Sequence, residues 1–224
     1  CDLCIGKVKF SNYDNSKERI FKAFELQNKL NETKKPLVVL LHSFSLNAQV
    51  WKELAENLRL KDYNVLAMDL RGHGRSVYNE NLKLKSRFYY KADTWQKLPK
   101  DMVDAVKYVK NNYPKVNSND IIIVGADIGA ISGAIGGMSL SKPPLKMVLI
   151  SPMLEFKGIR MPLRTNKFFD TKIMMVLAKT DRILMNFNTK TPPVIKQYSV
   201  GGPGNQLIKV NKEAYDEIVK FIIN

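Results

Sequence analysis

The apolar residues of this chain form short continuous runs that alternate with segments of helical periodicity. The runs are rich in valine and isoleucine, which is typical of parallel strands buried on both faces. They occupy residues 37–41, 65–68, 121–124, 147–150 and 173–177. Helical stripes are formed by Trp51, Leu54 and Leu58, by Val103, Val106 and Val109, and by Ala214, Ile218, Phe221 and Ile222. This alternation predicts an α/β domain with a mostly parallel, doubly wound sheet and helices on both faces.

The two ends of the chain add to this pattern. Residues 5–10 and 18–26 are strand-like, and the second stretch alternates apolar and polar positions, as expected for a half-buried antiparallel strand. Asn211 is placed to cap the last helix at its N-terminus. We therefore expect residues 1–4 to be an N-terminal tail and residues 5–224 to form one domain.

Composition agrees with a single globular domain. The chain has 224 residues, of which 45% are hydrophobic and 25% charged. No apolar run is long enough to cross a bilayer. The net charge of +15 comes mostly from lysine, but no tight basic run with interleaved aromatic residues appears. We interpret the lysines as a solvated surface and expect no nucleic-acid partner, with binding to an anionic surface as a weaker alternative.

The chain begins at a cysteine rather than a methionine. A mature chain that begins this way resembles a bacterial lipoprotein with Cys1 as the lipidated residue, which predicts membrane association at the cell envelope. The alternative is that a domain boundary of a cytoplasmic protein happens to fall at this position. Cys1 and Cys4 are the only cysteines, so a zinc site would lack two ligands and no metal is expected, whereas a disulfide between them stays open.

Three motifs follow one another at the ends of predicted strands. They read LLHSFS at residues 40–45, AMDLRGHGRS at 67–76 and IIIVGADIGA at 121–130. In this order and spacing they resemble the motifs of the α/β-hydrolase superfamily, in particular those of its small dienelactone-hydrolase-like and esterase-like members, which have no cap domain. The resemblance covers roughly residues 5 to 224. It implies an α/β-hydrolase fold without a cap domain, with residues 125–129 as the turn that carries the nucleophile.

The central residue of that turn is Asp127, where a serine hydrolase has its serine. The turn holds this residue at positive φ and close to the following helix, and the small residues around it provide the room. Aspartate tolerates positive φ better than most residues, and a helix N-terminus favours its negative charge. Haloalkane dehalogenases and epoxide hydrolases use an aspartate in a similar turn as nucleophile, but they also need a late histidine.

No histidine follows Asp127 in this chain. By the resemblance, Asp181 stands at the position of the triad acid. Pro203 stands at the histidine position, give or take a residue, and proline has no proton-transfer group. Two of the three triad positions are therefore changed, which predicts a degenerate triad. His42 and His73 belong to earlier loops, where a structural role is more typical.

Two roles for the Asp127 carboxylate stay open. It either accepts hydrogen bonds from the backbone N–H groups near Phe44 and Ile128, the oxyanion-hole positions, or acts with Asp181 on a cationic ligand or a shared proton. The sequence contains no phosphate loop, dinucleotide fingerprint or metal-ligand cluster, so no cofactor is expected.

The sequence thus predicts a non-catalytic α/β-hydrolase-fold protein that acts in binding or as a structural component. A small-molecule ligand in the vestigial site is part of this prediction. The competing hypothesis is an active hydrolase of carboxylic esters or related acyl compounds with a non-standard site. The missing histidine favours the first, because loss of triad members costs several orders of magnitude in rate. The oligomeric state has no signature in the sequence.

Overall fold

The computed structural model describes residues 4–10, 19–25, 34–77, 87–181 and 185–224. Cys1, and with it the predictions of a lipidated terminus and of a bond between the two cysteines, lies outside the described residues. No helix in the described part of the chain is long and apolar enough to cross a membrane.

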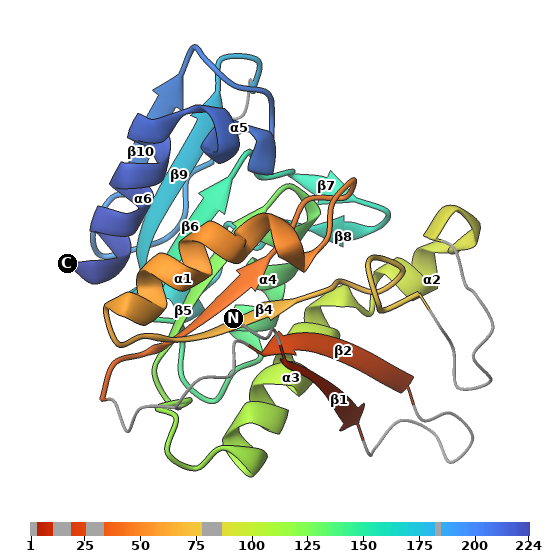
Figure 1. Cartoon of the computed structure of the whole chain (residues 1–224). Coiled ribbons are helices and arrows are strands. Elements are labelled where there is room, and N and C mark those ends of the chain that lie inside the picture. Colours follow the sequence, from red (N-terminus) through yellow and green to blue (C-terminus); the bar gives the residue numbers. More distant parts are fainter. Residues whose placement is uncertain (1–3, 11–18, 26–33, 78–86, 182–184) are drawn as a thin grey trace.

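The described strands form an eight-stranded sheet with the order β1-β2-β4-β3-β5-β6-β9-β10 (Figure 1). Neighbouring strands from β4 to β10 are parallel, whereas β2 runs antiparallel to both β1 and β4. The mostly parallel sheet and the antiparallel N-terminal strands are therefore confirmed. The strands are β1 Cys4–Phe10, β2 Arg19–Glu25, β3 Leu37–Leu41, β4 Asn64–Met68, β5 Ile121–Ala126, β6 Lys146–Ile150, β9 Lys172–Ala178 and β10 Val194–Tyr198.

Helices cover both faces of this sheet, as predicted (Figure 1). On one face lie α1 (Lys52–Leu60), α5 (Asn205–Val210) and α6 (Lys212–Ile223); on the other lie α3 (Leu98–Asn112) and α4 (Ile128–Met138). The predicted cap of α6 is present, because the side chain of Asn211 accepts a hydrogen bond from the nitrogen of Ala214 at 3.0 Å. The shorter elements are η1 Ala48–Trp51, η2 Arg87–Tyr89, α2 Ala92–Trp95, β7 Glu155–Phe156, β8 Ile159–Arg160 and η3 Asn166–Phe168.

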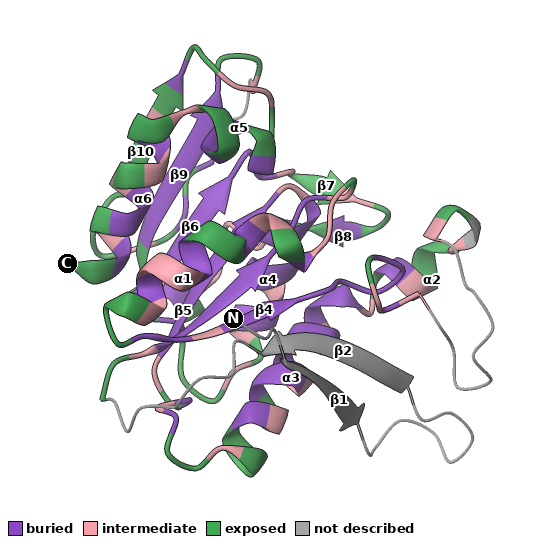
Figure 2. Cartoon of the chain, in the orientation of Figure 1, coloured by how far each residue is buried: buried purple, intermediate pink, exposed green. Residues whose placement is uncertain are grey.

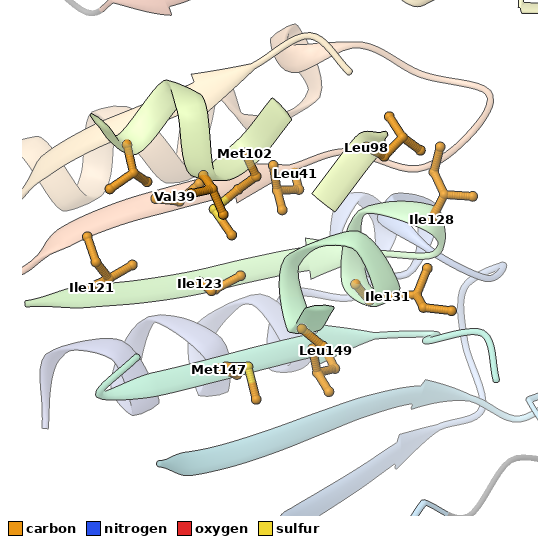
Figure 3. Close-up of a cluster of buried hydrophobic side chains, with 14 of the residues drawn as sticks. Val39, Leu41, Leu98, Met102, Ile121, Ile123, Ile128, Ile131, Met147 and Leu149 are labelled. Carbon is orange, nitrogen blue, oxygen red and sulfur yellow. The ribbon is translucent and has the colours of Figure 1, made fainter. Parts of the chain in front are cut away.

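The central strands β3 and β5 are buried throughout and β6 is buried except at Lys146, which explains their continuous apolar runs (Figure 2). Alternate residues of β3 point to opposite faces, so Val39 and Leu41 join the core under α3 and α4 while Val38 and Leu40 join the core under α1 and α6. Figure 3 shows the first of these cores, in which Met102 of α3 lies close to Val39 and Leu41. Each fully buried side chain of this size stabilises the fold by about 1.5–3 kcal/mol.

The strand order brings the carboxyl ends of β3, β5, β6 and β9 to one edge of the sheet. In open α/β sheets this is the edge at which ligands bind. Only the β7–β8 hairpin and η3 lie between β6 and β9, so no cap domain is inserted there, in agreement with the prediction.

Candidate functional site

Asp127 lies in the tight turn between β5 and α4 and has φ 55° and ψ −116°. The neighbouring glycines make this turn sterically feasible. A Cβ atom on Gly125 would come within 2.5 Å of the carbonyl oxygen of Gly129, and a Cβ on Gly129 would collide with the backbone of Leu41 at the end of β3. The turn therefore packs directly on the neighbouring strand and presents Asp127 at the carboxyl edge of the sheet.

The Asp127 carboxylate is bound by a main-chain donor. Its Oδ2 accepts a hydrogen bond from the nitrogen of Phe44 at 3.0 Å. The N–H group of Ile128, the first residue of α4, also favours the charged form of this carboxylate. Burial raises the pKa of Asp127 above its ordinary value, and the negative charge of Asp181 adds to this increase. The two N–H groups oppose it. The structure thus brings together three of the predicted site residues, Asp127, Phe44 and Ile128.

Asp181 follows β9, and its own hydrogen bonds close a turn at the end of that strand. Its Oδ2 accepts a hydrogen bond from the nitrogen of Ala178 at 2.8 Å, and its nitrogen donates to the oxygen of Ala178 at 2.9 Å. Asp181 acts on Asp127 through its charge. The structure therefore gives Asp181 a local structural role and an electrostatic effect on the neighbouring carboxylate.

The segment after β10 approaches Asp127 through Gly204. Pro203 is exposed, whereas Gly204 is buried with φ 64°. A Cβ atom on Gly204 would lie 3.6 Å from the Cβ of Asp127 and would collide with the hydroxyl of Ser43. The residue of this segment that contacts Asp127 is thus one position beyond Pro203, and it has no side chain.

Ser43 and Asn205 join this segment to the loop after β3. The Oδ1 of Asn205 accepts hydrogen bonds from the nitrogen of Ser43 at 2.8 Å and from its hydroxyl at 2.9 Å. In return, the nitrogen of Asn205 donates to the hydroxyl of Ser43 at 3.0 Å. Neither residue of this pair was predicted as a site residue. Ser43 lies in the LLHSFS motif, but nothing in the sequence indicated Asn205.

His42 is a buried structural residue. The nitrogen of Leu70 donates to its Nε2 at 2.9 Å, so the ring proton lies on Nδ1, which donates to the oxygen of Ser43 at 2.7 Å. Burial, with a contribution from His73, lowers the pKa of His42 from 6.5 to about 3. The ring is therefore neutral and holds the loop after β3 against the loop after β4.

His73 is also buried and faces main-chain oxygens. Its Nδ1 lies 2.9 Å from the oxygen of Arg71 and its Nε2 lies 2.6 Å from the oxygen of Phe44. Burial lowers the pKa of His73, an effect that the facing carbonyl groups oppose. His42 and His73 are the only histidines of this sequence, and all four of their ring nitrogens face main-chain groups.

Polar residues of the DLRGHGRS motif after β4 form hydrogen bonds and an ion pair with neighbouring segments. Asp69 accepts hydrogen bonds from the nitrogens of Ala48 and Arg75, both at 2.8 Å. The guanidinium of Arg71 forms a buried, two-bonded ion pair with Asp101 of α3. This motif therefore ties the loops of the carboxyl edge to one another and to α3.

Aromatic side chains surround the other side of Phe44. Its ring centroid lies 5.6 Å from that of Trp95 and 5.8 Å from that of Phe156, and the guanidinium of Arg87 lies over the ring at 5.2 Å. These contacts come from α2, the β7–β8 hairpin and η2. They hold the loop that supplies the Phe44 nitrogen to Asp127. Within the described ranges, no three His, Cys, Asp or Glu side chains gather in a way that could hold a metal ion.

Comparison with known families gives two matches. A family model described as serine aminopeptidase, S33 matches residues 32–200. A second model, described as SNIPE associated domain, matches residues 1–37. No curated protein matches the chain.

Several solved structures are similar over nearly the whole chain. A probable hydrolytic enzyme from Pseudomonas aeruginosa has a TM-score of 0.65 at 9% identity, covering 99% of this chain and 95% of its own. A predicted CIB-like hydrolase from Thermoplasma acidophilum has a TM-score of 0.59 at 17% identity, covering 99% of each chain. A dienelactone hydrolase-like promiscuous phosphotriesterase from metagenomic libraries has a TM-score of 0.56 at 14% identity, covering 98% and 97%. At these identities the likeness shows the fold.

Proposed function

The chain belongs to the serine aminopeptidase S33 family of α/β hydrolases, and we propose that within this family it is a non-catalytic member that acts as a binding or structural protein. The observation that carries the proposal is the hydrogen bond that the nitrogen of Phe44 donates to the Asp127 carboxylate at the oxyanion-hole position. In a serine hydrolase, N–H groups at these positions bind the substrate oxygen as it becomes negatively charged. Here the protein's own carboxylate accepts the hydrogen bond of the Phe44 donor, and the Ile128 N–H group favours its charged form.

The histidine environments support the same proposal. Hydrolysis of an ester needs a general base within hydrogen-bond reach of the nucleophile or the attacking water. His42 accepts a main-chain hydrogen bond, and its lowered pKa makes it a poor base. His73 faces the main-chain oxygen of Arg71 in its own loop and that of Phe44 in the loop after β3. Neither ring is placed to activate a nucleophile at Asp127.

The segment that ends β10 supports it as well. In active members of the superfamily, the loop after this strand supplies the catalytic histidine. Here Gly204 lies beside Asp127 at positive φ, and an added Cβ would be strained there and would displace the Ser43 hydroxyl that binds Asn205. The Ser43–Asn205 hydrogen bonds hold this segment against the loop after β3.

The half-buried carboxylate of Asp127 is the group that a small-molecule ligand would contact at the carboxyl edge of the sheet. The aromatic ring of Phe44, itself half-buried, lies beside the donor that holds that carboxylate. These two groups are the basis for placing the proposed binding function at the vestigial site rather than elsewhere on the surface.

The test is an esterase assay with short p-nitrophenyl esters on the whole chain and on the Asp127→Asn variant, with an active esterase as the positive control. We expect hydrolysis by the wild-type chain to equal that of the variant and of buffer. Circular dichroism would confirm that both chains are folded. Turnover by the wild-type chain that Asp127→Asn abolishes would overturn the proposal in favour of an active ester hydrolase.

A further inference from the structure

Arg87 carries a positive charge beside the candidate site. It belongs to η2, and its guanidinium carbon lies over the ring of Phe44 at 5.2 Å and over the ring of Phe88 at 5.0 Å. Phe44 is also the residue whose nitrogen donates to Asp127. The charge of Arg87 reaches the two buried histidines of the neighbouring loops and contributes to their lowered pKa values. Arg87 is therefore part of the group of loops that forms the candidate site.

No carboxylate of the described part of the chain neutralises this charge. Arg87 forms no ion pair there, whereas the guanidinium of Arg71, at the same edge of the sheet, is paired with Asp101. The Nε of Arg87 is buried and has no hydrogen-bond partner among the described residues. A charged donor without an acceptor is unfavourable, and hydrogen bonds to charged groups contribute more than neutral ones. The guanidinium group thus has hydrogen-bonding capacity that the protein does not use.

The aromatic neighbours of Arg87 decide from which direction an anion can bind it. An aromatic ring over a guanidinium group contacts its flat face through cation–π attraction. The N–H donors lie in the plane of the group, where a carboxylate accepts two parallel hydrogen bonds from a pair of them. Arg87 is half-buried and Phe88 is exposed, so this side of the site borders solvent. A carboxylate that binds at the edge of the guanidinium would place the rest of its molecule against these rings.

The negative charges of the site restrict the kind of anion. Asp127 and Asp181 lie at the same edge of the sheet, and the charge of Asp181 acts on Asp127. Both carboxylates repel a dianion such as phosphate more strongly than they repel a monoanion. The half-buried ring of Phe44 and the exposed ring of Phe88 offer apolar contact beside the positive charge. A singly charged carboxylate with an apolar or aromatic body fits this combination.

We propose that Arg87 is an anion-binding residue of the vestigial site and that it binds the carboxylate of a small aromatic or apolar carboxylic acid. This inference names the ligand class of the proposed binding function and rests on it. The Asp127 carboxylate keeps its hydrogen bond from Phe44 when the ligand binds, because the ligand occupies the guanidinium of Arg87 and the aromatic rings over it.

The test is an NMR titration of the isotope-labelled whole chain with benzoate, followed at the Nε–H of Arg87 and at the amide of Phe44. Constant ionic strength keeps the screening of the lysine-rich surface unchanged. We expect both signals to shift and to saturate. Benzamide, which has the same ring without the charge, should bind about tenfold more weakly or less well still. Inorganic phosphate should also bind more weakly than benzoate.

Three variants assign the binding to the guanidinium, with the Phe44 amide as the signal. Arg87→Gln removes the charge and should weaken benzoate binding by about tenfold or more. Arg87→Lys keeps the charge but lacks the planar pair of donors, so its loss should be smaller than that of Arg87→Gln. Arg59→Gln is the matched control, because Arg59 is also half-buried but lies on α1, on the opposite face of the sheet. It should bind benzoate as the wild-type chain does.

Four results would overturn the assignment: no saturable shift in the wild-type chain, equal binding of benzamide, tighter binding of phosphate, or unchanged benzoate binding in Arg87→Gln. Should that variant fail to fold, as judged by circular dichroism, the comparison of benzoate with benzamide on the wild-type chain decides. Turnover in the esterase assay would contradict the proposed function and leave the benzoate result standing. A chain that neither hydrolyses esters nor binds benzoate would overturn only the ligand class, so the two failures are distinguishable.

Discussion

The main-chain nitrogen of Phe44 donates a hydrogen bond to the Oδ2 of Asp127 across 3.0 Å, although the two residues are 83 positions apart in the chain. The bond joins the loop after β3 to the turn after β5, two strands that are neighbours in the sheet. It places a charged carboxylate in a half-buried position with main-chain partners, and this environment gives the charge a measurable effect on stability.

The charge of Asp127 should make the protein less stable, relative to an Asp127→Asn variant, as the pH rises. Burial raises the pKa of Asp127, so the folded state binds more protons than the unfolded state between the ordinary value of 3.8 and the raised value. The free energy of unfolding contributed by this group is therefore greatest in acid and falls as the pH rises through that window. Urea unfolding of both chains at pH 4 and pH 7 measures the effect. A wild-type chain that gained stability over the variant at pH 7 would contradict the prediction.

The Ser43–Asn205 pair should show energetic coupling. Three hydrogen bonds link the two residues, and Asn205 is fully buried, so removal of either side chain leaves the other with unpaired polar atoms. We expect Asn205→Ala to cost about 1–3 kcal/mol of unfolding free energy. In a double-mutant cycle with Ser43→Ala, the coupling energy should be about 1–2 kcal/mol. Strict additivity of the two single variants would show that the bonds contribute nothing as a pair.

Two glycines of α4 should respond oppositely to replacement by alanine. A Cβ on Gly129 collides with the backbone of Leu41, which cannot move without disturbing β3, so we expect Gly129→Ala to cost about 3 kcal/mol or more. A Cβ on Gly137 first meets the terminal carbon of Ile123 at 3.2 Å, and alanine favours the helix by about 1 kcal/mol. Gly137→Ala should therefore be neutral or stabilising. Thermal unfolding of both variants checks this, and equal losses would refute the role of the close approach.

His42 should stay neutral far below the usual range. Its pKa is lowered to about 3 because the ring is buried, with a contribution from His73. A second proton would also break the hydrogen bond that Nε2 accepts from Leu70. NMR of the ring nitrogens should show the Nδ1–H tautomer and no titration of His42 down to about pH 4. A His73→Gln variant identifies the remaining ring signal as His42. A midpoint near 6.5 for that signal would disprove the buried, neutral ring.

The central strands and the turn at Asp127 were predictable from the sequence for local reasons. Strands β3, β5 and β6 are buried on both faces, so almost every residue in them is apolar and their runs stand out. The turn can be recognised in the sequence because only small residues fit around Asp127. Strand β10, by contrast, has no apolar run, because it lies at the edge of the sheet with exposed residues such as Val194 and Ile195.

The partners of the site residues were only partly predictable. The family resemblance indicated that N–H groups near Phe44 and Ile128 would face Asp127, but not that Ser43 would bind Asn205, 162 positions away. Polar residues in loops carry no periodicity, and a hydrogen bond between loops leaves no pattern in either segment. The loop contacts that bury His42 and His73 and keep their rings neutral likewise leave no pattern in the sequence.

By itself, the sequence determined the layered α/β architecture, because strands buried on both faces are apolar at almost every position. It also determined the presence of an aspartate in the nucleophile turn, because the small residues that give this turn its steric room are its neighbours in the chain. The tertiary structure decided what that aspartate does: its carboxylate accepts a hydrogen bond from Phe44 beside Gly204, while the ring nitrogens of both histidines face main-chain groups. Those relationships depend on where loops from different strands meet, and only the packed sheet and its helices set those positions.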